Sequence, residues 1–223
     1  MARRTKEEAL ETRNLILDTA ERMFSERGVA HTSLADIATA AELTRGAIYW
    51  HFKNKCELFV AMVDRELLPM DELMAESIDA REPDPLGRLR TILVKCLLDI
   101  AHNPRRCTVI EIMLLKWEHT VDMQPVIDRK RDNVKRTVDV LQRAIANAIA
   151  KGQLPNTLDT TFAANFLHSL ILGALTDHVA GYSTCTLLND AQRLIDSFLD
   201  MLRCSPALLR PKMAEAGRAD GSA

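Results

Sequence analysis

The chain has 223 residues, 47% of them hydrophobic, which suits one or two helical domains with a real core. The formal net charge of -2 argues against a protein that coats nucleic acid, so any DNA contact has to come from a local basic patch. The start is charged and no run of about 18 apolar residues occurs, so the sequence predicts no signal peptide, no membrane span and a cytoplasmic protein.

The residue usage favours helix from end to end, because Ala, Leu, Glu, Arg and Lys abound and aromatic residues are sparse. Residues 1–6 predict a basic arm, which could contact phosphate or a minor groove or could simply fray. From about Glu7 to Arg27, apolar side chains return at helical spacing, and Gly28 follows where a helix would end. The predicted fold class is all-α.

Residues 32–55, TSLADIATAAELTRGAIYWHFKNK, predict two short helices joined by a tight turn. Ser33, with Asp36 three residues later, indicates a helix that begins near Leu34. Thr44 offers the same start for a second helix. The pattern is typical of a helix-turn-helix whose second helix reads DNA.

Charge and size support the DNA interpretation of this stretch. From Leu43 to Lys55 there are three bases, one histidine and no acid, and phosphate contacts need such donors. Small residues after Arg45 leave the helix slim enough for a major groove. The alternative is an ordinary solvated hairpin with a few surface bases. The predicted DNA-binding residues are Ser33, Thr44, Arg45, Gly46, Ala47, Tyr49, Trp50, His51 and Lys55.

Asn54 and Glu57 predict the start of a long fourth helix that links this part to the rest of the chain. Pro69 lies inside that helix and should kink or break it near Leu67. Further helices are expected at about 85–101 and 104–118, then a seventh after a break at 122–125, and two more at about 158–180 and 187–203. One face of the seventh helix is read as solvated surface, not a second DNA site; it carries Arg129, Lys130, Arg131, Lys135 and Arg136.

The last two predicted helices are apolar over a wider arc than one core-facing stripe needs. They could pair with the same two helices of a second copy, or they could simply be central helices. A two-fold dimer would present two reading helices to a palindromic site. The small, polar residues after Pro211 predict a disordered tail.

Catalysis requires a constellation that this sequence lacks. There is no glycine-rich phosphate loop, no nucleophile elbow and no HExxH pair, and the five cysteines are scattered singly. We therefore expect no enzyme activity, no cofactor and no metal. A helical adaptor that binds a protein partner remains an alternative, but it would leave Arg45, Tyr49 and His51 without a purpose.

The stretch TRGAIYWHFKNK, preceded by TSLADIATAAEL and RRTKEEALETRNLIL, resembles the DNA-binding domain of the TetR family of repressors. The chain is most similar to the AcrR-like branch, which controls multidrug efflux pump operons. The segments EIMLLKWEH, KGQLP followed by LD, and LDMLRCSPALLR match that branch in order and spacing, so the resemblance covers nearly the whole chain. One departure is Glu42, which stands in the turn where relatives usually have Gly.

The resemblance implies a DNA-binding domain at 9–69, with its reading hairpin at 33–52 and the fourth helix as a link. It implies a ligand-binding and dimerisation domain at 70–210 and a tail at 211–223. The implied partners are double-stranded palindromic operator DNA, a second copy of the chain and a hydrophobic or aromatic inducer. The implied function is a ligand-responsive repressor of an efflux operon, released by apolar or cationic aromatic compounds. The alternative is a TetR-type repressor that responds to a metabolite.

The implied ligand cavity lies between the helices of the larger domain, although composition alone cannot distinguish a cavity from a packed core. Relatives often have polar side chains where this chain has Ile110 and Leu114, so the ligand preference is expected to be more apolar or different. A buried Asp177 would favour cationic, planar ligands, unless it meets a histidine or solvent. The implied lining is Met70, Leu89, Ile92, Cys96, Ile110, Met113, Leu114, Trp117, Thr137, Leu141, His168, Ile171 and Asp177.

Overall fold

The computed structural model describes residues 6–75, 78–182 and 186–210, without the side chains at 69–71 and 75. Within these ranges the chain forms nine α-helices and short 3-10 turns, and an isolated antiparallel bridge joins Leu158 to Leu209. The all-α prediction is confirmed. The predicted tail at 211–223 and the first five residues of the basic arm lie outside the described residues.

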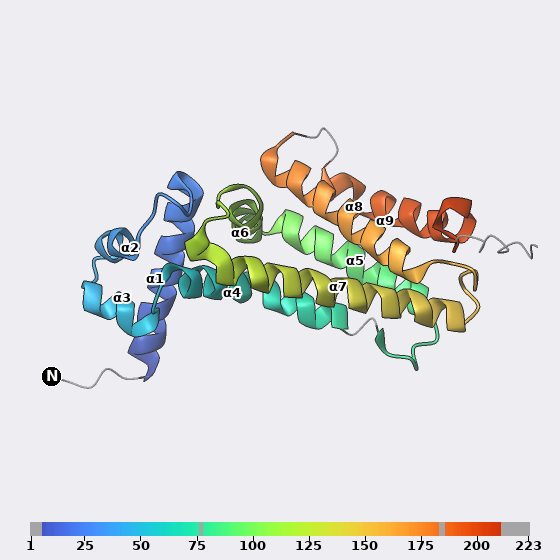
Figure 1. Cartoon of the computed structure of the whole chain (residues 1–223), viewed down its shortest axis with the longest axis horizontal. Coiled ribbons are helices and arrows are strands. Elements are labelled where there is room, and N and C mark those ends of the chain that lie inside the picture. Colours follow the sequence, from blue (N-terminus) through green and yellow to red (C-terminus); the bar gives the residue numbers. More distant parts are fainter. Residues whose placement is uncertain (1–5, 76–77, 183–185, 211–223) are drawn as a thin grey trace, which may run out of the picture.

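Three helices gather at one end of the elongated molecule (Figure 1): α1 (Lys6–Arg27), α2 (Leu34–Ala40) and α3 (Arg45–His51). Their inward side chains are fully buried, among them Leu17, Phe24 and Ile48. Helix α1 ends at Gly28, which has a positive φ of 81° and donates its N–H to the carbonyl of Phe24 at 2.9 Å. A residue with a side chain would be strained at this φ, which explains why glycine ends the helix here.

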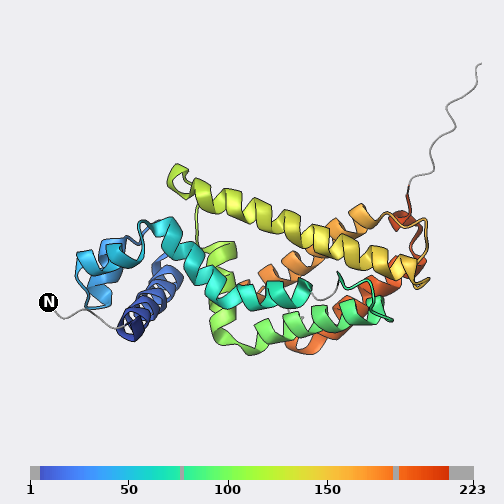
Figure 2. The same ribbon diagram turned by 90° about the horizontal axis from the view of Figure 1, so that it is seen from below.

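Helix α4 (Lys55–Ala75) starts beside these three helices and runs into the rest of the molecule (Figure 2). The side-chain oxygen of Asn54 accepts the N–H of Glu57 at 2.8 Å, which is the predicted cap. The helix is continuous across position 69 but its axis changes direction part-way along (Figure 2), so of the two predicted outcomes the helix bends and does not break. Helix α4 packs against α1, α6 and α7, and such tertiary contacts can hold a helix in which proline removes one internal hydrogen bond.

The remaining helices form the larger part of the molecule: α5 (Pro85–His102), α6 (Pro104–Leu115), α7 (Gln124–Ala150), α8 (Thr160–Ala180) and α9 (Leu187–Cys204). Asp84 and Asn103 cap α5 and α6 through their side-chain oxygens, as predicted. Helix α6 ends three residues before the predicted 118. Helix α7 begins at Gln124 and so includes Pro125 in its first turn, where proline needs no donor.

Two hydrophobic cores hold the molecule together. One lies among α5, α7, α8 and α9 and includes Leu89, Leu141 and Phe198. The other fills the α1–α4 end and continues onto α6 through Val109 and Ile112. The α6 helix therefore shares a core with the predicted DNA-binding part. None of the described helices combines the length and the low charge needed to span a membrane.

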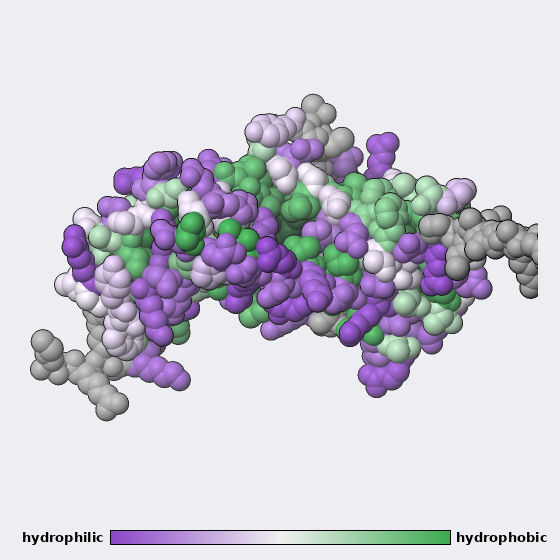
Figure 3. Space-filling model, in the orientation of Figure 1, coloured by the Kyte–Doolittle hydropathy of each residue, from purple (hydrophilic) through white to green (hydrophobic). Residues whose placement is uncertain are grey.

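Hydrophobic residues gather on the surface over α8, whereas the face of α7 that lies in front is mainly hydrophilic (Figure 3). Several large apolar side chains are exposed on α8, α9 and the loop between them: Phe162, Leu172, Tyr182 and Leu188. Exposed apolar patches of this kind are typical of surfaces that another molecule covers.

Candidate DNA and ligand sites

Residues 33–52, which we call the reading head, are organised by two side-chain caps. The N–H of Ser33 donates to the carboxylate of Asp36 at 2.9 Å, and the N–H of Asp36 donates to the hydroxyl of Ser33 at 3.1 Å. The hydroxyl of Ser33 also donates to the carboxylate of Asp36 at 2.6 Å, and this bond, together with that from the N–H of Ser33, lowers the pKa of Asp36. The N–H of Ala47 donates to the hydroxyl of Thr44 at 3.2 Å. Both predicted helix starts are confirmed, and both hydroxyls serve as caps.

Helix α3 is anchored by its inner face and presents its outer face to solvent. Ile48 and Phe52 are buried at 0% and 1% exposure, whereas Tyr49 and Trp50 are 54% and 73% exposed. Arg45 and Gly46 are also exposed, and Ala47 is half-buried. Such large, exposed aromatic side chains on a seven-residue helix have no role in the core. The arrangement suits insertion of the helix into a major groove.

Two of the predicted DNA-binding residues face partly inward. The ammonium of Lys55 donates to the carbonyl of Val29 at 2.7 Å and so ties the α1–α2 loop to the start of α4. The half-buried ring of His51 meets the Trp50 ring edge-on, with the ring centres 4.5 Å apart. The structure therefore gives Lys55 and His51 contacts that support the reading head itself.

The turn between α2 and α3 contains Glu42, the one non-glycine residue with a positive φ (56°) in the described chain. The N–H of Glu42 donates to the carbonyl of Thr39 at 3.1 Å, and that of Leu43 donates to Ala38 at 2.8 Å. This pair of bonds is the Schellman motif, which usually has glycine at the position of Glu42. Glu42 therefore adopts a left-handed backbone conformation, which costs a non-glycine residue about 1 kcal/mol.

A cavity of about 240 Å³ lies between α4, α5, α6, α7 and α8, and we call it the apolar cavity. Its polar groups are Thr137, His168 and the Cys96 thiol. Burial lowers the pKa of His168, which keeps the ring uncharged at neutral pH. The cavity is lined by Leu67, Met74, Leu93, Cys96, Leu97, Ile100, Ile110, Met113, Leu114, Thr137, Leu141, His168, Ile171, Leu172 and Leu175.

A second cavity of about 200 Å³ adjoins the first, and we call it the Lys130 cavity. It lies between α4, α6, α7 and α8 and shares six lining residues with the apolar cavity, including Met113 and Leu114. Its own lining is more polar, with an Arg129–Asp64 ion pair of 2.6 Å. The residues found only here are Phe59, Val60, Val63, Asp64, Leu68, Trp117, Val126, Arg129, Lys130, Asn133 and Val134.

Short contacts connect the end of α6 and the segment after it to the loop before α2 and to the start of α4. The N–H of Val29 donates to the carbonyl of Lys116 at the end of α6 (2.8 Å). The early end of α6 that the structure shows is what frees this carbonyl. The thiol of Cys56 donates to the carbonyl of Asp122 at 2.8 Å. A change in α6 would therefore reach the α1–α2 loop directly.

An ion-pair cluster spans the same joint between α1, α4 and α6. Arg65 lies 2.8 Å from Asp18, and Arg105 lies 2.9 Å from Glu21 and 3.0 Å from Glu66. Burial raises the pKa of Glu21 even though both arginines act in the opposite direction. The cluster holds three helices in one arrangement.

Two parts of the chain match known protein families. Residues 16–62 match the family described as bacterial regulatory proteins, tetR family, and residues 84–204 match the MAATS-type transcriptional repressor, C-terminal region. The chain belongs to the TetR family. The predicted family is confirmed.

Similar members of the TetR family extend over nearly the whole chain. The HTH-type transcriptional regulator TtgR of Pseudomonas putida is 42% identical over 208 residues, 93% of this chain and 99% of TtgR. The regulator AcrR of Shigella flexneri is 36% identical over 96% of this chain and 100% of AcrR. The crystal structure of NalD, the secondary repressor of the MexAB-OprM multidrug efflux pump in Pseudomonas aeruginosa, has a TM-score of 0.81 at 30% identity, covering 90% of this chain and 100% of NalD. These relatives confirm the predicted branch.

The structure brings together eight of the residues proposed for a TetR-type ligand cavity: Cys96, Ile110, Met113, Leu114, Thr137, Leu141, His168 and Ile171. Trp117 lies in the Lys130 cavity. Leu89 and Ile92 line neither cavity, because their faces of α5 are fully buried against the rest of the protein. The side chain of Met70 lies outside the described residues.

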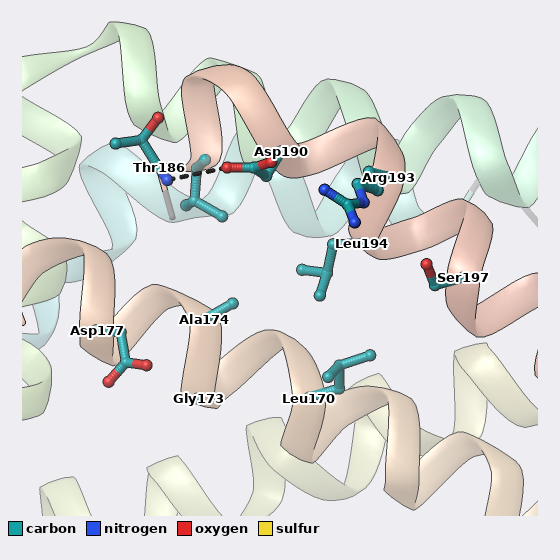
Figure 4. Close-up of a pocket in the computed structure, with 10 residues that line it drawn as sticks. Leu170, Gly173, Ala174, Asp177, Thr186, Asp190, Arg193, Leu194 and Ser197 are labelled. Atoms are coloured by element: carbon teal, nitrogen blue, oxygen red, sulfur yellow. Dashed lines mark hydrogen bonds between the residues drawn. The ribbon is translucent and has the colours of Figure 1, made fainter. Parts of the chain in front are cut away.

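Asp177 is placed differently from the sequence-based expectation. It lies in a groove of about 570 Å³ between α8 and α9, its side chain is exposed, and its carboxylate points away from α9 (Figure 4). We call this the α8–α9 groove; it is lined by Leu170, Gly173, Ala174, Asp177, Thr186, Leu187, Asp190, Arg193, Leu194 and Ser197. Of the two alternatives for Asp177, the structure shows the one that faces solvent, so its predicted place in the ligand cavity is wrong and the preference for cationic ligands loses its basis.

Sequence reasoning also misses residues of both cavities. Leu93, Leu97 and Ile100 belong to an apolar stripe whose period does not distinguish core from cavity. The charge pattern places Lys130 on a solvated face, but it is half-buried and lies against Trp117. The spacing from Val126 through Lys130 to Thr137 could have indicated a shared inward face.

Proposed function

We propose that this chain is a ligand-responsive transcriptional repressor of a multidrug efflux operon, released from its operator by apolar aromatic compounds. The observation that carries the proposal is the position of α6. This helix lines both cavities and shares a hydrophobic core with the reading head. Occupation of a cavity can therefore change the arrangement of the helix that reads DNA.

In the proposed complex, Arg45 reaches a base edge while Tyr49 and Trp50 lie along the phosphates. Gly46 and Ala47 allow close approach of α3 to the groove. Lys55 and His51 support DNA binding indirectly, since Lys55 holds the α1–α2 loop and His51 packs at the end of α3. The caps at Ser33 and Thr44 orient free backbone amides toward the same phosphates.

A homodimer would supply the second reading head that a palindromic operator requires. The α8–α9 groove and the exposed apolar side chains near it support such a dimer, because a second copy would cover them (Figure 4). In Figure 4, Leu170 and Ala174 project from α8 toward α9, and Leu194 projects back. The efflux target is supported by the resemblance to NalD.

Ligand release follows from a shift between two states of the dimer. A ligand can favour one state only by binding it more tightly than the other. We assign the arrangement described above, in which the carbonyl of Lys116 accepts the N–H of Val29 and the Arg65 and Arg105 cluster joins α1 to α4 and α6, to the DNA-binding state. A ligand that displaces Met113 or Leu114 would move α6 and change the spacing of the two heads.

The test is binding of the full-length protein to DNA from just upstream of its own gene, followed by fluorescence anisotropy at several salt concentrations. Arg45→Ala should weaken specific binding about 30-fold or more, because a bidentate base contact contributes about 1–3 kcal/mol and a dimer makes it twice. Arg131→Ala is the matched control, since Arg131 is an exposed arginine on α7. Addition of N-phenyl-1-naphthylamine, a neutral apolar aromatic compound, should release the DNA.

Specific, salt-sensitive binding that Arg45→Ala abolishes and the aromatic compound reverses would support the proposal in full. Specific binding that no aromatic compound disturbs would favour the alternative, a TetR-type repressor controlled by a metabolite. Equal binding by the wild type and Arg45→Ala would contradict the role given to α3.

A further inference from the structure

The cavity-facing side of α7 carries a charge that the proposed function does not use. Lys130 lies one turn after Val126 and two turns before Thr137, so it shares their inward face. It is half-buried, and no carboxylate among the described residues lies within ion-pair distance of it. By contrast, each of its two neighbours on α7 has a carboxylate partner: Arg129 pairs with Asp64 and Arg131 pairs with Asp128.

The ammonium of Lys130 is held at the cavity wall by a fixed aromatic ring. Its nitrogen lies 5.4 Å from the centre of the Trp117 ring. Two contacts fix the Trp117 ring. Its Nε1–H donates to the carbonyl of Met113 at 2.6 Å, and the Phe59 ring packs beside it with the ring centres 5.9 Å apart. Burial lowers the pKa of Lys130, as expected for an ammonium that is shielded from water and has no carboxylate of the described residues within ion-pair distance.

The charges around Lys130 leave the cavity with one excess positive charge. The Arg129–Asp64 pair is neutral as a unit, and the uncharged ring of His168 adds nothing. A half-buried cation without an anionic partner is unfavourable. An anion that enters with a ligand would relieve that cost, whereas a cation would add to it.

We propose that the Lys130 cavity binds the acidic group of an amphipathic aromatic ligand, such as a carboxylate, sulfonate or phenolate. The aromatic body of the ligand extends past Met113 and Leu114 into the apolar cavity, with which the Lys130 cavity shares its wall. Trp117 flanks the acidic group, and Lys130 donates to it. This inference rests on the proposed ligand-responsive repression and specifies the class of inducer.

The experiment compares two probes with the same aromatic skeleton. 8-Anilinonaphthalene-1-sulfonate carries an anionic group that N-phenyl-1-naphthylamine lacks, and both become fluorescent in apolar sites. Lys130→Met removes the charge and keeps an unbranched side chain of similar length. It should weaken sulfonate binding about tenfold or more, because a hydrogen bond to a charged group is lost, and leave the neutral probe within about twofold.

Three further variants control the experiment. Lys135→Met removes an exposed lysine of the same helix and should change neither affinity. Arg193→Gln tests the α8–α9 groove, where an anionic probe could also bind. Lys130→Arg keeps the charge and should retain sulfonate binding, which separates loss of charge from damage to the fold.

Equal loss of both probes in Lys130→Met, or loss of sulfonate binding in Arg193→Gln instead, would overturn the inference. The DNA-binding assay is read separately. If the wild type binds no operator, the proposed repression fails even when the probe selectivity is found. If it binds operator and the neutral probe releases it while Lys130→Met treats both probes like the wild type, only the anionic class fails.

Discussion

The reading head and the cavity region are built on different principles. The reading head comes from one stretch of 20 residues. Each of its two helices follows a residue whose side-chain hydroxyl accepts the backbone N–H three positions later. The cavities draw their walls from five helices, with lining residues that range from Phe59 to Leu175. The first region is closely packed around side chains such as Ile48, whereas the second keeps space that no side chain fills. Local chemistry therefore determines the head, and only tertiary packing determines the cavities.

The same truncation placed in each region should have very different effects. Ile48→Ala should lower the free energy of unfolding by about 2–5 kcal/mol, because it leaves a cavity in a closely packed core. Ile171→Ala should cost only about 1–2 kcal/mol, since one side of Ile171 already faces the apolar cavity. Urea unfolding at equal protomer concentration measures both changes. Equal losses would contradict the contrast between the two regions.

The ion-pair cluster that joins the two regions should show a smaller, pH-dependent effect. Arg105→Met removes one of the two arginines that pair with Glu21 and Glu66, which are only 13% and 12% exposed, and leaves Arg65 as the other. The expected loss is about 1–2 kcal/mol at neutral pH, reduced from the value for a buried pair because Arg105 itself is 40% exposed.

The sign of the pH dependence follows from Glu21. Its pKa is raised in the folded protein, so the folded chain binds the proton more tightly than the unfolded chain. Removal of Arg105 raises that pKa further. The destabilisation by Arg105→Met should therefore be larger at about pH 7.5 than at about pH 5.5, where Glu21 can take up a proton. Arg22→Met, which removes an exposed pair with Glu26, should show no such trend.

These differences explain what could be predicted from the sequence. The helix starts at Ser33 and Thr44 could be predicted because each carries its own cap. The cavity lining was only partly predictable, because Leu89 and Leu93 belong to the same apolar stripe of α5, yet only Leu93 reaches the apolar cavity. Lys130 could not be predicted, because the sequence shows only a run of basic residues along α7, which indicates a solvated face. The burial of Lys130 results from the packing of α7 beside Trp117 and α6.

The smallest expected effect concerns the turn of the reading head. Glu42→Gly should raise the free energy of unfolding by up to about 1 kcal/mol, because glycine adopts the φ of 56° without strain. Glycine occupies the other described positions with positive φ, and each follows the end of a helix: Gly28, Gly152 and Gly181. Thermal and urea unfolding of the variant measure the gain.

Glu42→Ala separates the two possible costs of this residue. Alanine removes the acid but keeps the strained backbone, so it should strengthen operator binding slightly without the stability gain of glycine. If Glu42→Ala stabilises as much as Glu42→Gly, the cost at this position is electrostatic and not conformational. If both variants leave operator binding unchanged across a salt titration, the carboxylate of Glu42 lies too far from the phosphates to act on them, and the turn matters only for the geometry of α3.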